Sequence, residues 1–309
     1  MPDTIALHVF DERLHEALDP NPAIEKLADG FTFIEGPIWH PDEHWLVFSD
    51  IPESRQYRWT PVEGISLHRW PSNMANGNCF DGEGRILTCE HGTSSVVRLE
   101  NEGKVLTPLA THFGDKRLNS PNDIVVDRAG RIYFTDPPFG RQDHALGVGY
   151  PRQAELDFAG VYRLDPDGSL HLLADDFEGP NGLCLSLDES ALFVSDTFRF
   201  HIRRFDLDGE GRASGGDVWA PVDADFTDPT AGKKWVPDGL KSDVEGRLYS
   251  SGPGGIHVIH PDATPLGVML MPEKSANFCF GMAGRDHLIT TSSTGLYSVA
   301  TKTSGPPII

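Results

Sequence analysis

The 309-residue sequence is poor in cysteine and in basic residues, and it has no long apolar run. Its four cysteines, Cys79, Cys89, Cys184 and Cys279, lie inside apolar stretches without CxxC spacing, so we expect buried, reduced thiols. No run approaches the roughly 18 apolar residues that a membrane span requires, which excludes an integral membrane protein. The N-terminus lacks a basic segment followed by an apolar one, which argues against a signal peptide and predicts a cytoplasmic protein.

The shortage of positive charge excludes further classes of partner. There are 26 Lys and Arg against 46 Asp and Glu, a formal net charge of −20. This charge opposes binding to nucleic acid and to anionic membrane surfaces, both of which depend on basic side chains. The sequence also lacks the GxxxxGK[ST] loop of nucleotide-binding proteins and the GxSxG elbow of α/β-hydrolases. We therefore expect neither nucleic acid nor a membrane as a partner, and no feature predicts an oligomeric state.

What the sequence does have is turn residues and short apolar segments. It contains 32 Gly, 24 Pro and 17 Phe, a composition typical of many short strands joined by tight turns. Good helix formers gather only in residues 11–18 and 23–28, before a stop signal at Gly30. Beyond them, alternating patterns at 44–50, 131–136, 191–196 and 247–251 predict strands. The fold class expected is therefore all-β, with a short helical N-terminal extension over residues 1–30.

An internal repeat gives the architecture. Six similar segments recur about every 48 residues, a period typical of a four-stranded propeller blade. Each begins with a polar residue, usually before glycine: Glu35, Asn76, Asn122, Asn181, Asp238 and Asn277. We therefore predict a single six-bladed β-propeller domain over residues 1–309, with the segment before Glu35 adding an outer strand to the last blade. Two longer spacings mark insertions at 138–159 and 221–235, which are candidates for a lid or binding loops.

The first residue of each repeat is a candidate site residue. In a propeller the innermost strands line a central channel, so these six residues are predicted to form a ring around it. Carboxylates and carboxamides offer only oxygen donors, which suit a hard cation such as Ca²⁺, Mg²⁺ or Mn²⁺. Asn and Asp before Gly are also common turn residues, which would explain most of the ring but not Glu35. Both interpretations remain open at this point.

Several ordered motifs between about residue 30 and residue 298 resemble a known family: FIEGPIW, LTCEHG, KRLNSPNDIVVDRAGRIYFTDPPFG, GPNGL and VPDGLKSDVEGRLY. They resemble the SMP-30/gluconolactonase/LRE family, and among its members the bacterial gluconolactonases. The resemblance implies a lactone hydrolase with one divalent cation, held by Glu35, Asn181 and Asp238. Ca²⁺ is the cation expected first, with Mg²⁺, Mn²⁺ or Zn²⁺ as alternatives. Glu35 and Asp238 are the expected catalytic residues, Asp238 as the proton-transfer group.

The same resemblance suggests the groups that contact the substrate. Asn122 matches the asparagine of the family's SPND motif, and with Asp123, Asn76 and His91 it is expected to bind substrate. Animal members carry an arginine two residues before this asparagine, where the present sequence has Ser120. The expected reaction opens a sugar lactone to the aldonic acid: a cation polarises the carbonyl while a carboxylate accepts the proton of water.

We expect substrate choice to depend on polar residues of the two insertions, because the ring would serve any lactone. The candidates are Arg141, Asp143, His144 and Tyr150 in the first insertion, and Asp225, Asp228, Lys233 and Trp235 in the second. Two other functions fit a metal-binding propeller. One is hydrolysis of organophosphates or fluorophosphates. The other is a non-catalytic interaction platform, which fold alone does not exclude. A polar ring under inserted loops favours a small-molecule ligand over a protein surface.

Overall fold

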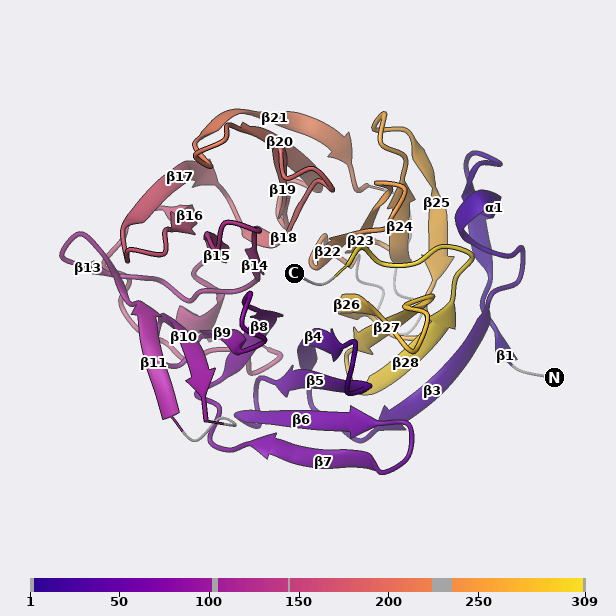
Figure 1. Cartoon of the computed structure of the whole chain (residues 1–309), viewed down its shortest axis with the longest axis horizontal. Helices are drawn as coiled ribbons and strands as arrows, with labels where there is room; N and C mark the ends of the chain where they lie inside the picture. Colours follow the sequence, from indigo (N-terminus) through magenta and orange to yellow (C-terminus); the bar gives the residue numbers. More distant parts are fainter. Residues whose placement is uncertain (1–2, 102–104, 144, 224–234, 308–309) are drawn as a thin grey trace.

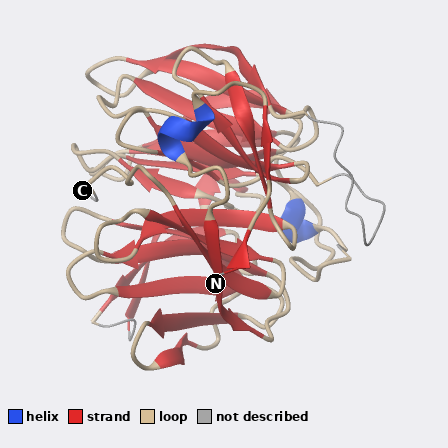
Figure 2. Ribbon diagram, turned by 90° about the vertical axis from the view of Figure 1, so that its right-hand side faces the viewer, coloured by secondary structure: helices blue, strands red, loops and turns tan. Residues whose placement is uncertain are grey.

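Six antiparallel sheets surround a central axis in this protein, as Figure 1 shows. The computed structural model describes residues 3–101, 105–143, 145–223 and 235–307. Seen edge-on, the sheets stand side by side and loops leave both faces (Figure 2). The predicted all-β, six-bladed propeller is confirmed.

The first three blades have the strands β4 (Ile34–His40), β5 (Trp45–Asp50), β6 (Arg55–Thr60) and β7 (Gly64–Arg69); β8 (Ala75–Phe80), β9 (Ile86–Glu90), β10 (Ser95–Glu100) and β11 (Val105–Ala110); and β14 (Ile124–Val126), β15 (Ile132–Asp136), β16 (Ala159–Leu164) and β17 (Leu170–Phe177). The fourth blade has β18 (Pro180–Leu185), β19 (Ala191–Asp196), β20 (His201–Leu207) and β21 (Ala213–Pro221). A small hairpin, β12 (His112–Phe113) and β13 (Lys116–Arg117), lies between blades 2 and 3 in the sequence. The 3₁₀ helix η1 (Phe139–Arg141) lies within blade 3, in the long connection from β15 to β16.

The last two blades recruit N-terminal strands. Blade 5 has β22 (Leu240–Ser242), β23 (Leu248–Gly252), β24 (Gly255–Ile259) and β25 (Pro265–Leu270), extended by β2 (Leu7–Val9). Blade 6 has β26 (Ser275–Gly281), β27 (His287–Ser292) and β28 (Gly295–Ala300), extended by β3 (Ala23–Asp29) and β1 (Asp3–Thr4). The outer strand expected from the segment before Glu35 is therefore confirmed, and it protects the edge of β28.

The expected helical character of the N-terminal extension is confirmed in the first of its two segments and is wrong in the second. The only α-helix among the described residues is α1 (Leu14–Ala17), and the segment assigned to a second helix is strand β3. Leu14, Ala17 and Leu18 are buried against blades 5 and 6, which holds one turn of helix in place. In the next segment, backbone pairing with β28 outweighs the local helix propensity of residues 23–28.

The core lies between adjacent blades. The second strands β5, β15 and β19 are buried along their whole length because each is covered by a blade on both faces. Tyr133 and Val161 of blade 3, for example, pack with Leu192 and Val194 of blade 4. All four cysteines are free thiols. Among the described residues, no helix is long and apolar enough to cross a membrane.

Candidate functional site

The glycines that follow the ring residues are needed for close packing of the inner strands. A Cβ atom at Gly36 would lie 2.1 Å from the carbonyl oxygen of Asn76, and one at Gly182 would lie 2.2 Å from that of Asp238. A Cβ atom at Gly77 would lie 2.5 Å from the carbonyl oxygen of Asn122, and one at Gly239 would lie 2.3 Å from the side-chain Oδ1 of Asn277. Of these four glycines only Gly36 has a positive φ, +55°. The repeated glycine therefore lets neighbouring inner strands approach each other, and a turn does not account for it.

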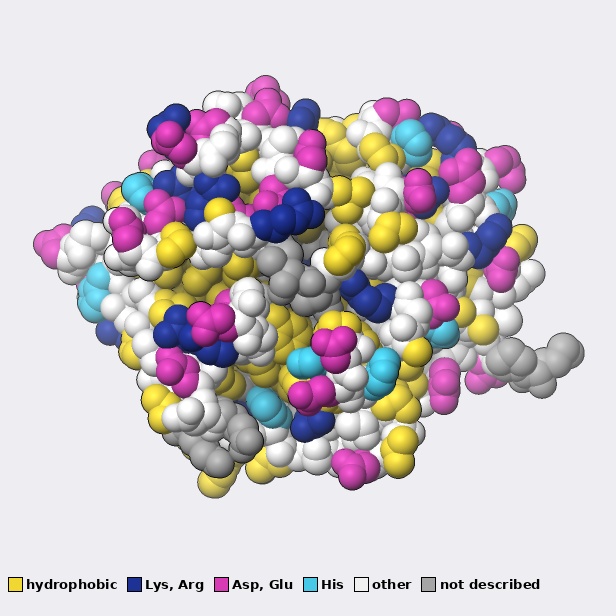
Figure 3. All heavy atoms as spheres, in the orientation of Figure 1, with side chains coloured by type: hydrophobic (Ala, Val, Ile, Leu, Met, Phe, Trp, Pro, Cys, Tyr) yellow, Lys and Arg dark blue, Asp and Glu magenta, His cyan; other side chains and the backbone are white. Residues whose placement is uncertain are grey.

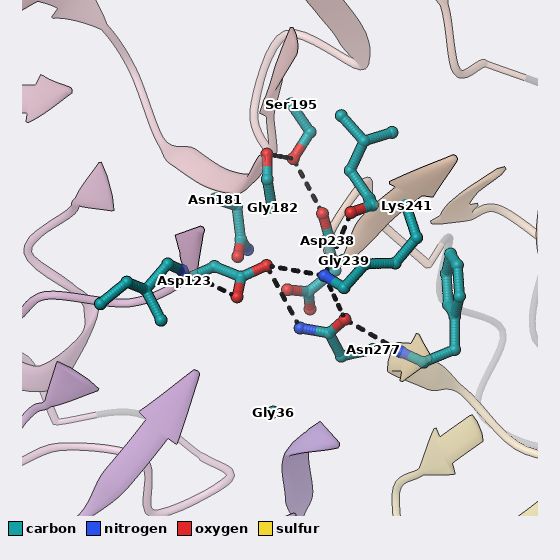
Figure 4. A network of polar contacts seen from close by, with 12 residues as sticks. Gly36, Asp123, Asn181, Gly182, Ser195, Asp238, Gly239, Lys241 and Asn277 are labelled. Atoms are coloured by element: carbon teal, nitrogen blue, oxygen red, sulfur yellow. Dashed lines mark hydrogen bonds and ion pairs between the residues drawn. The ribbon is translucent and has the colours of Figure 1, made fainter. Parts of the chain in front are cut away.

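Hydroxyl groups fix the ring from the neighbouring blade. A serine or threonine on the second strand of one blade donates a hydrogen bond of 2.8 Å to the backbone carbonyl of the next blade's ring residue: Ser49 to Asn76, Thr135 to Asn181 and Ser195 to Asp238. The last of these bonds is drawn in Figure 4. These three ring residues are thus each positioned by two blades.

Five of the six ring residues line one cavity of about 210 Å³: Glu35, Asn76, Asn122, Asn181 and Asp238. His91, Thr197 and Lys274 are also part of its lining. The remaining wall is largely apolar, and consists mainly of Phe33, Ile51, Phe139, Leu146, Val148, Phe198 and Val236. The structure therefore brings together most of the residues expected from the sequence in a space suited to a small molecule.

Two buried carboxylates face this cavity. Glu35 is 3% exposed and Asp238 is 6% exposed. Burial, followed by the negative charges of Asp238 and Asp123, raises the pKa of Glu35 well above its usual value. Burial also raises the pKa of Asp238, to about 6, although Lys274 Nζ lies 3.7 Å from its Oδ2 and opposes this shift. The negative charges of the two acids are therefore poorly compensated by the protein, and a bound cation would stabilise their ionised forms.

The amide of Asn181 has a fixed orientation. The Thr197 hydroxyl donates to the carbonyl of Pro237 at 2.9 Å, so its proton is already used. Its oxygen can then only accept, at 3.0 Å, from the Asn181 Nδ2 group. The Asn181 side chain must therefore offer its Oδ1 atom to a ligand of the cavity.

His91 orients Asn76 by the same logic. Burial lowers the pKa of His91 to about 4, so the ring is neutral, and its Nδ1 donates to the Val148 carbonyl at 2.7 Å. Nε2 must then accept from Asn76 Nδ2, 3.1 Å away. This leaves Asn76 Oδ1 buried without a hydrogen-bond partner in the described part of the chain. A buried oxygen without a partner, in the same cavity as the two carboxylates, is available to accept a hydrogen bond from a ligand.

Neutral His91 makes the fold sensitive to acid. The histidine pKa is about 4 in the folded protein and 6.5 when unperturbed, so the unfolded chain takes up the proton first. Stability is therefore complete above pH 6.5 and falls by up to about 3 kcal/mol as the pH drops through 4. We expect His91→Gln to flatten this dependence in urea denaturation at several pH values. His112→Gln, at an exposed position, is the control, and an unchanged slope in His91→Gln would contradict the assignment.

Asp123 does not line the cavity, in contrast to its expected role in substrate binding. Its Oδ2 atom accepts hydrogen bonds from Lys241 Nζ and Asn277 Nδ2, both at 3.4 Å. Figure 4 shows these three side chains pointing toward one another beside Asp238. Lys241 Nζ also donates to Asn277 Oδ1 at 3.4 Å, so the sixth ring residue belongs to this network. Asp123, Lys241 and Asn277 therefore lie on the axis next to the site and are not part of the cavity lining.

The first insertion contributes to the cavity, but with residues other than those expected. Phe139, Gln142, Leu146 and Val148 line it. The guanidinium of Arg141 is instead bound to the backbone carbonyls of Leu118, Asn119 and Gln153. Tyr150 donates to the Gly92 carbonyl, Asp143 is absent from the cavity lining, and Trp235 is buried in the core. His144, Asp225, Asp228 and Lys233 lie outside the described residues.

Ser120 has a structural role that an arginine could not fill. Its hydroxyl oxygen accepts from the Gly140 backbone N–H at 2.9 Å, and the hydroxyl donates to the Pro137 carbonyl at 2.5 Å. The serine therefore holds η1 and the start of the insertion. Sequence reasoning missed this contact and Lys274, because neither residue occupies a repeated position.

The donor set of the cavity suits a hard cation. Among the described residues no three His, Cys, Asp or Glu side chains group closely enough to hold a metal ion. An ion held by Glu35 and Asp238 would thus need an amide ligand, and the fixed Oδ1 atom of Asn181 is available for that purpose. Two carboxylates and amide oxygens are ligands typical of Ca²⁺.

Residues 33–294 match the family described as the SMP-30/Gluconolactonase/LRE-like region. The chain belongs to this family. A gluconolactonase of Zymomonas mobilis in the family is 32% identical over 313 residues, covering 96% of this chain and 86% of the relative. The pentonolactonase XacC of Haloferax volcanii is 28% identical over 84% of this chain and 81% of the relative. The solved structure of a gluconolactonase from Xanthomonas campestris matches with a TM-score of 0.86 and 32% identity, over 97% of this chain and 96% of that one.

Proposed function

We propose that this protein is a lactone hydrolase that opens a sugar lactone of the gluconolactone type to its aldonic acid. The observation that carries the proposal is the cavity of about 210 Å³, in which two buried carboxylates face amide groups of fixed orientation. The lactonases among its relatives, which match nearly the whole chain, support the same reaction class. The free thiols fit a reducing, cytoplasmic location.

A divalent cation, which we infer to be Ca²⁺, would be held by Glu35, Asn181 and Asp238. When bound, such an ion polarises a carbonyl group and increases the acidity of water. The raised pKa values of the two acids mean that their negative charges are poorly compensated in the protein alone. Mg²⁺, Mn²⁺ and Zn²⁺ remain alternatives that a reconstitution series would separate.

The protein's own side chains would supply the proton acceptor and the groups that bind the substrate. Asp238 would accept the proton of the attacking water, and Lys274 Nζ, 3.7 Å from its Oδ2, would hold the carboxylate in position. Asn76, oriented by His91, offers its free Oδ1 to a hydroxyl of the substrate. Asn122 lines the same cavity and supplies another amide. The apolar wall excludes bulk water, which strengthens these polar interactions.

The direct test is a panel of lactones assayed on protein that has been chelated and reconstituted with each cation. Gluconolactone, galactonolactone, xylonolactone and an acyl-homoserine lactone would be compared with an organophosphate. We expect sugar lactones to be hydrolysed fastest and activity to depend on the added cation. Preferential hydrolysis of the organophosphate, or no hydrolysis with any cation, would overturn the proposal.

Gln142 is the polar residue through which the first insertion reaches the cavity. We expect Gln142→Ala to change the ratio of kcat/KM between two sugar lactones by about threefold to tenfold, because one hydrogen bond to a hydroxyl is lost. Cation affinity should stay the same. Gln153→Ala in the same insertion is the control, because that side chain is exposed and is not part of the lining. An equal ratio in all three proteins would assign specificity to the ring instead.

A further inference from the structure

A second set of residues lines the axis beyond the polar ring. Three positions after each ring residue the inner strands carry Ile38, Cys79, Val125, Cys184, Lys241 and Phe280. All six line a separate cavity of about 420 Å³, which also contacts Pro306 and Pro307. The first set is polar, whereas the second has five apolar or thiol side chains and one lysine. The two cavities are therefore chemically unlike.

This second cavity opens on the face where the C-terminus lies near the axis (Figure 1). Figure 3 shows hydrophobic side chains gathered around the centre of that face. A volume of about 420 Å³ is within the range of roughly 300–1,000 Å³ typical of pockets for organic ligands. The lining suits an apolar chain.

Three cations border the cavity, and two of them are paired. Lys241 Nζ lies 3.4 Å from Asp123, and Arg128 Nε lies 3.7 Å from Glu189. Arg285 differs, because within the described ranges its guanidinium has no carboxylate partner and its buried Nε has no hydrogen-bond partner. Burial lowers the pKa of Arg285, because its guanidinium has lost contact with water and no carboxylate compensates its charge.

A desolvated guanidinium at the edge of an apolar cavity is costly unless an anion pairs with it. Among the described residues of the lining, Glu189 is the only acidic one, and it is already bound to Arg128. The charge of Arg285 thus favours a ligand with an anionic group, and the apolar side chains of the inner strands favour a ligand with a hydrocarbon chain.

We propose that this cavity binds a monocarboxylate with an unbranched alkyl chain. The carboxylate pairs with Arg285, whose guanidinium can donate two parallel N–H···O bonds to it. The alkyl chain lies between the inner strands, against Cys184 and Val125. This site is separate from the proposed lactone site, and neither proposal depends on the other.

Binding can be measured by calorimetry on the full chain with hexanoate, octanoate and decanoate. Affinity should rise about fourfold per methylene, because each methylene leaves water. Arg285→Gln should weaken decanoate binding at least about tenfold, as expected for loss of a charge-assisted bond, and should leave decanol binding unchanged. Arg212→Gln is the matched control and should bind decanoate as the parent does, since Arg212 lies outside the cavity lining and pairs with Asp208.

Thiol labelling tests whether the ligand binds in this cavity, and it does not depend on lactone hydrolysis. Cys79 is partly exposed and lines the cavity, whereas Cys89 lies in the adjacent core. Decanoate should slow alkylation of Cys79 by iodoacetamide in the parent and not in Arg285→Gln, with Cys89 as an internal reference. No binding of decanoate, binding without protection of Cys79, or equal binding by Arg285→Gln would each overturn the proposal. Arg285→Gln is first checked for a native melting curve, and protection in the parent tests the site even if that variant unfolds.

Discussion

Asp238→Ala is expected to lower kcat/KM for sugar lactones by about three orders of magnitude or more, because it removes a cation ligand and the proton acceptor together. Asp238→Asn keeps the shape of the side chain and should lose activity to a similar extent. The fold should survive, since the carbonyl of residue 238 and not its side chain accepts the interblade bond from Ser195. Steady-state kinetics and circular dichroism would measure both effects.

The control for this pair is Asp206→Asn, an exposed aspartate on β20. It should keep the parent rate. If Asp238→Asn hydrolysed lactones at the parent rate, with the cation present, the proposed site would be wrong. If it lost activity by unfolding, its circular dichroism spectrum would show this directly.

Glu35→Gln is expected to weaken cation binding by at least about a hundredfold, because a charged ligand becomes a neutral one. The metal-free variant should at the same time be more stable than the parent at neutral pH. The pKa of Glu35 is raised in the folded protein, so its stabilising contribution is present at low pH and is lost as the pH rises through that pKa. Glutamine removes this cost. Calorimetric titration with Ca²⁺ and thermal melts in chelator would test both expectations.

Glu35→Gln is expected to lower cation affinity and to raise the stability of the metal-free protein, and these opposite effects distinguish it from a general disruption. A general disruption of the cavity would lower both cation affinity and stability. Unchanged affinity would exclude Glu35 as a ligand. Glu25→Gln on β3, where the side chain is exposed, should change neither quantity.

The sequence predicts the ring because the chemistry recurs with the period of the fold. Glu35, Asn181 and Asp238 occupy equivalent positions of a repeat, so knowing the repeat is enough to bring them to one axis. Lys274 and Phe198 are not repeated as residue types in the other blades, and their presence in the cavity follows only from the packed structure. The sequence also does not predict where the Asp123 side chain points, since its orientation depends on an ion pair with Lys241 from another blade.

The N-terminal extension shows why local patterns fail. Residues 23–28 contain good helix formers, yet Ile24 pairs with Val299 and Glu25 with Ser298 in blade 6. Hydrogen bonds to a strand that is distant in the sequence determine the conformation, and a local window contains no information on them. The apolar wall of the first insertion was missed for a related reason. The sequence predicts Arg141 as a specificity residue, but its guanidinium donates hydrogen bonds to the backbone carbonyls of Asn119 and Leu118.

The closure of blade 6 by β3 has a consequence for how the molecule is made. The pairing of β3 with β28 joins strands separated by the sequence of five whole blades, so its contact order is among the highest in the chain. Blades 1 to 4 are built from contiguous segments and are able to form as they leave the ribosome. The ring, however, stays open until β28 has been synthesised and β3 has found it. We therefore expect β3 docking to be the last and slowest step of folding, and the seam between β3 and β28 to be the place where hydrogen exchange first reports opening of the ring.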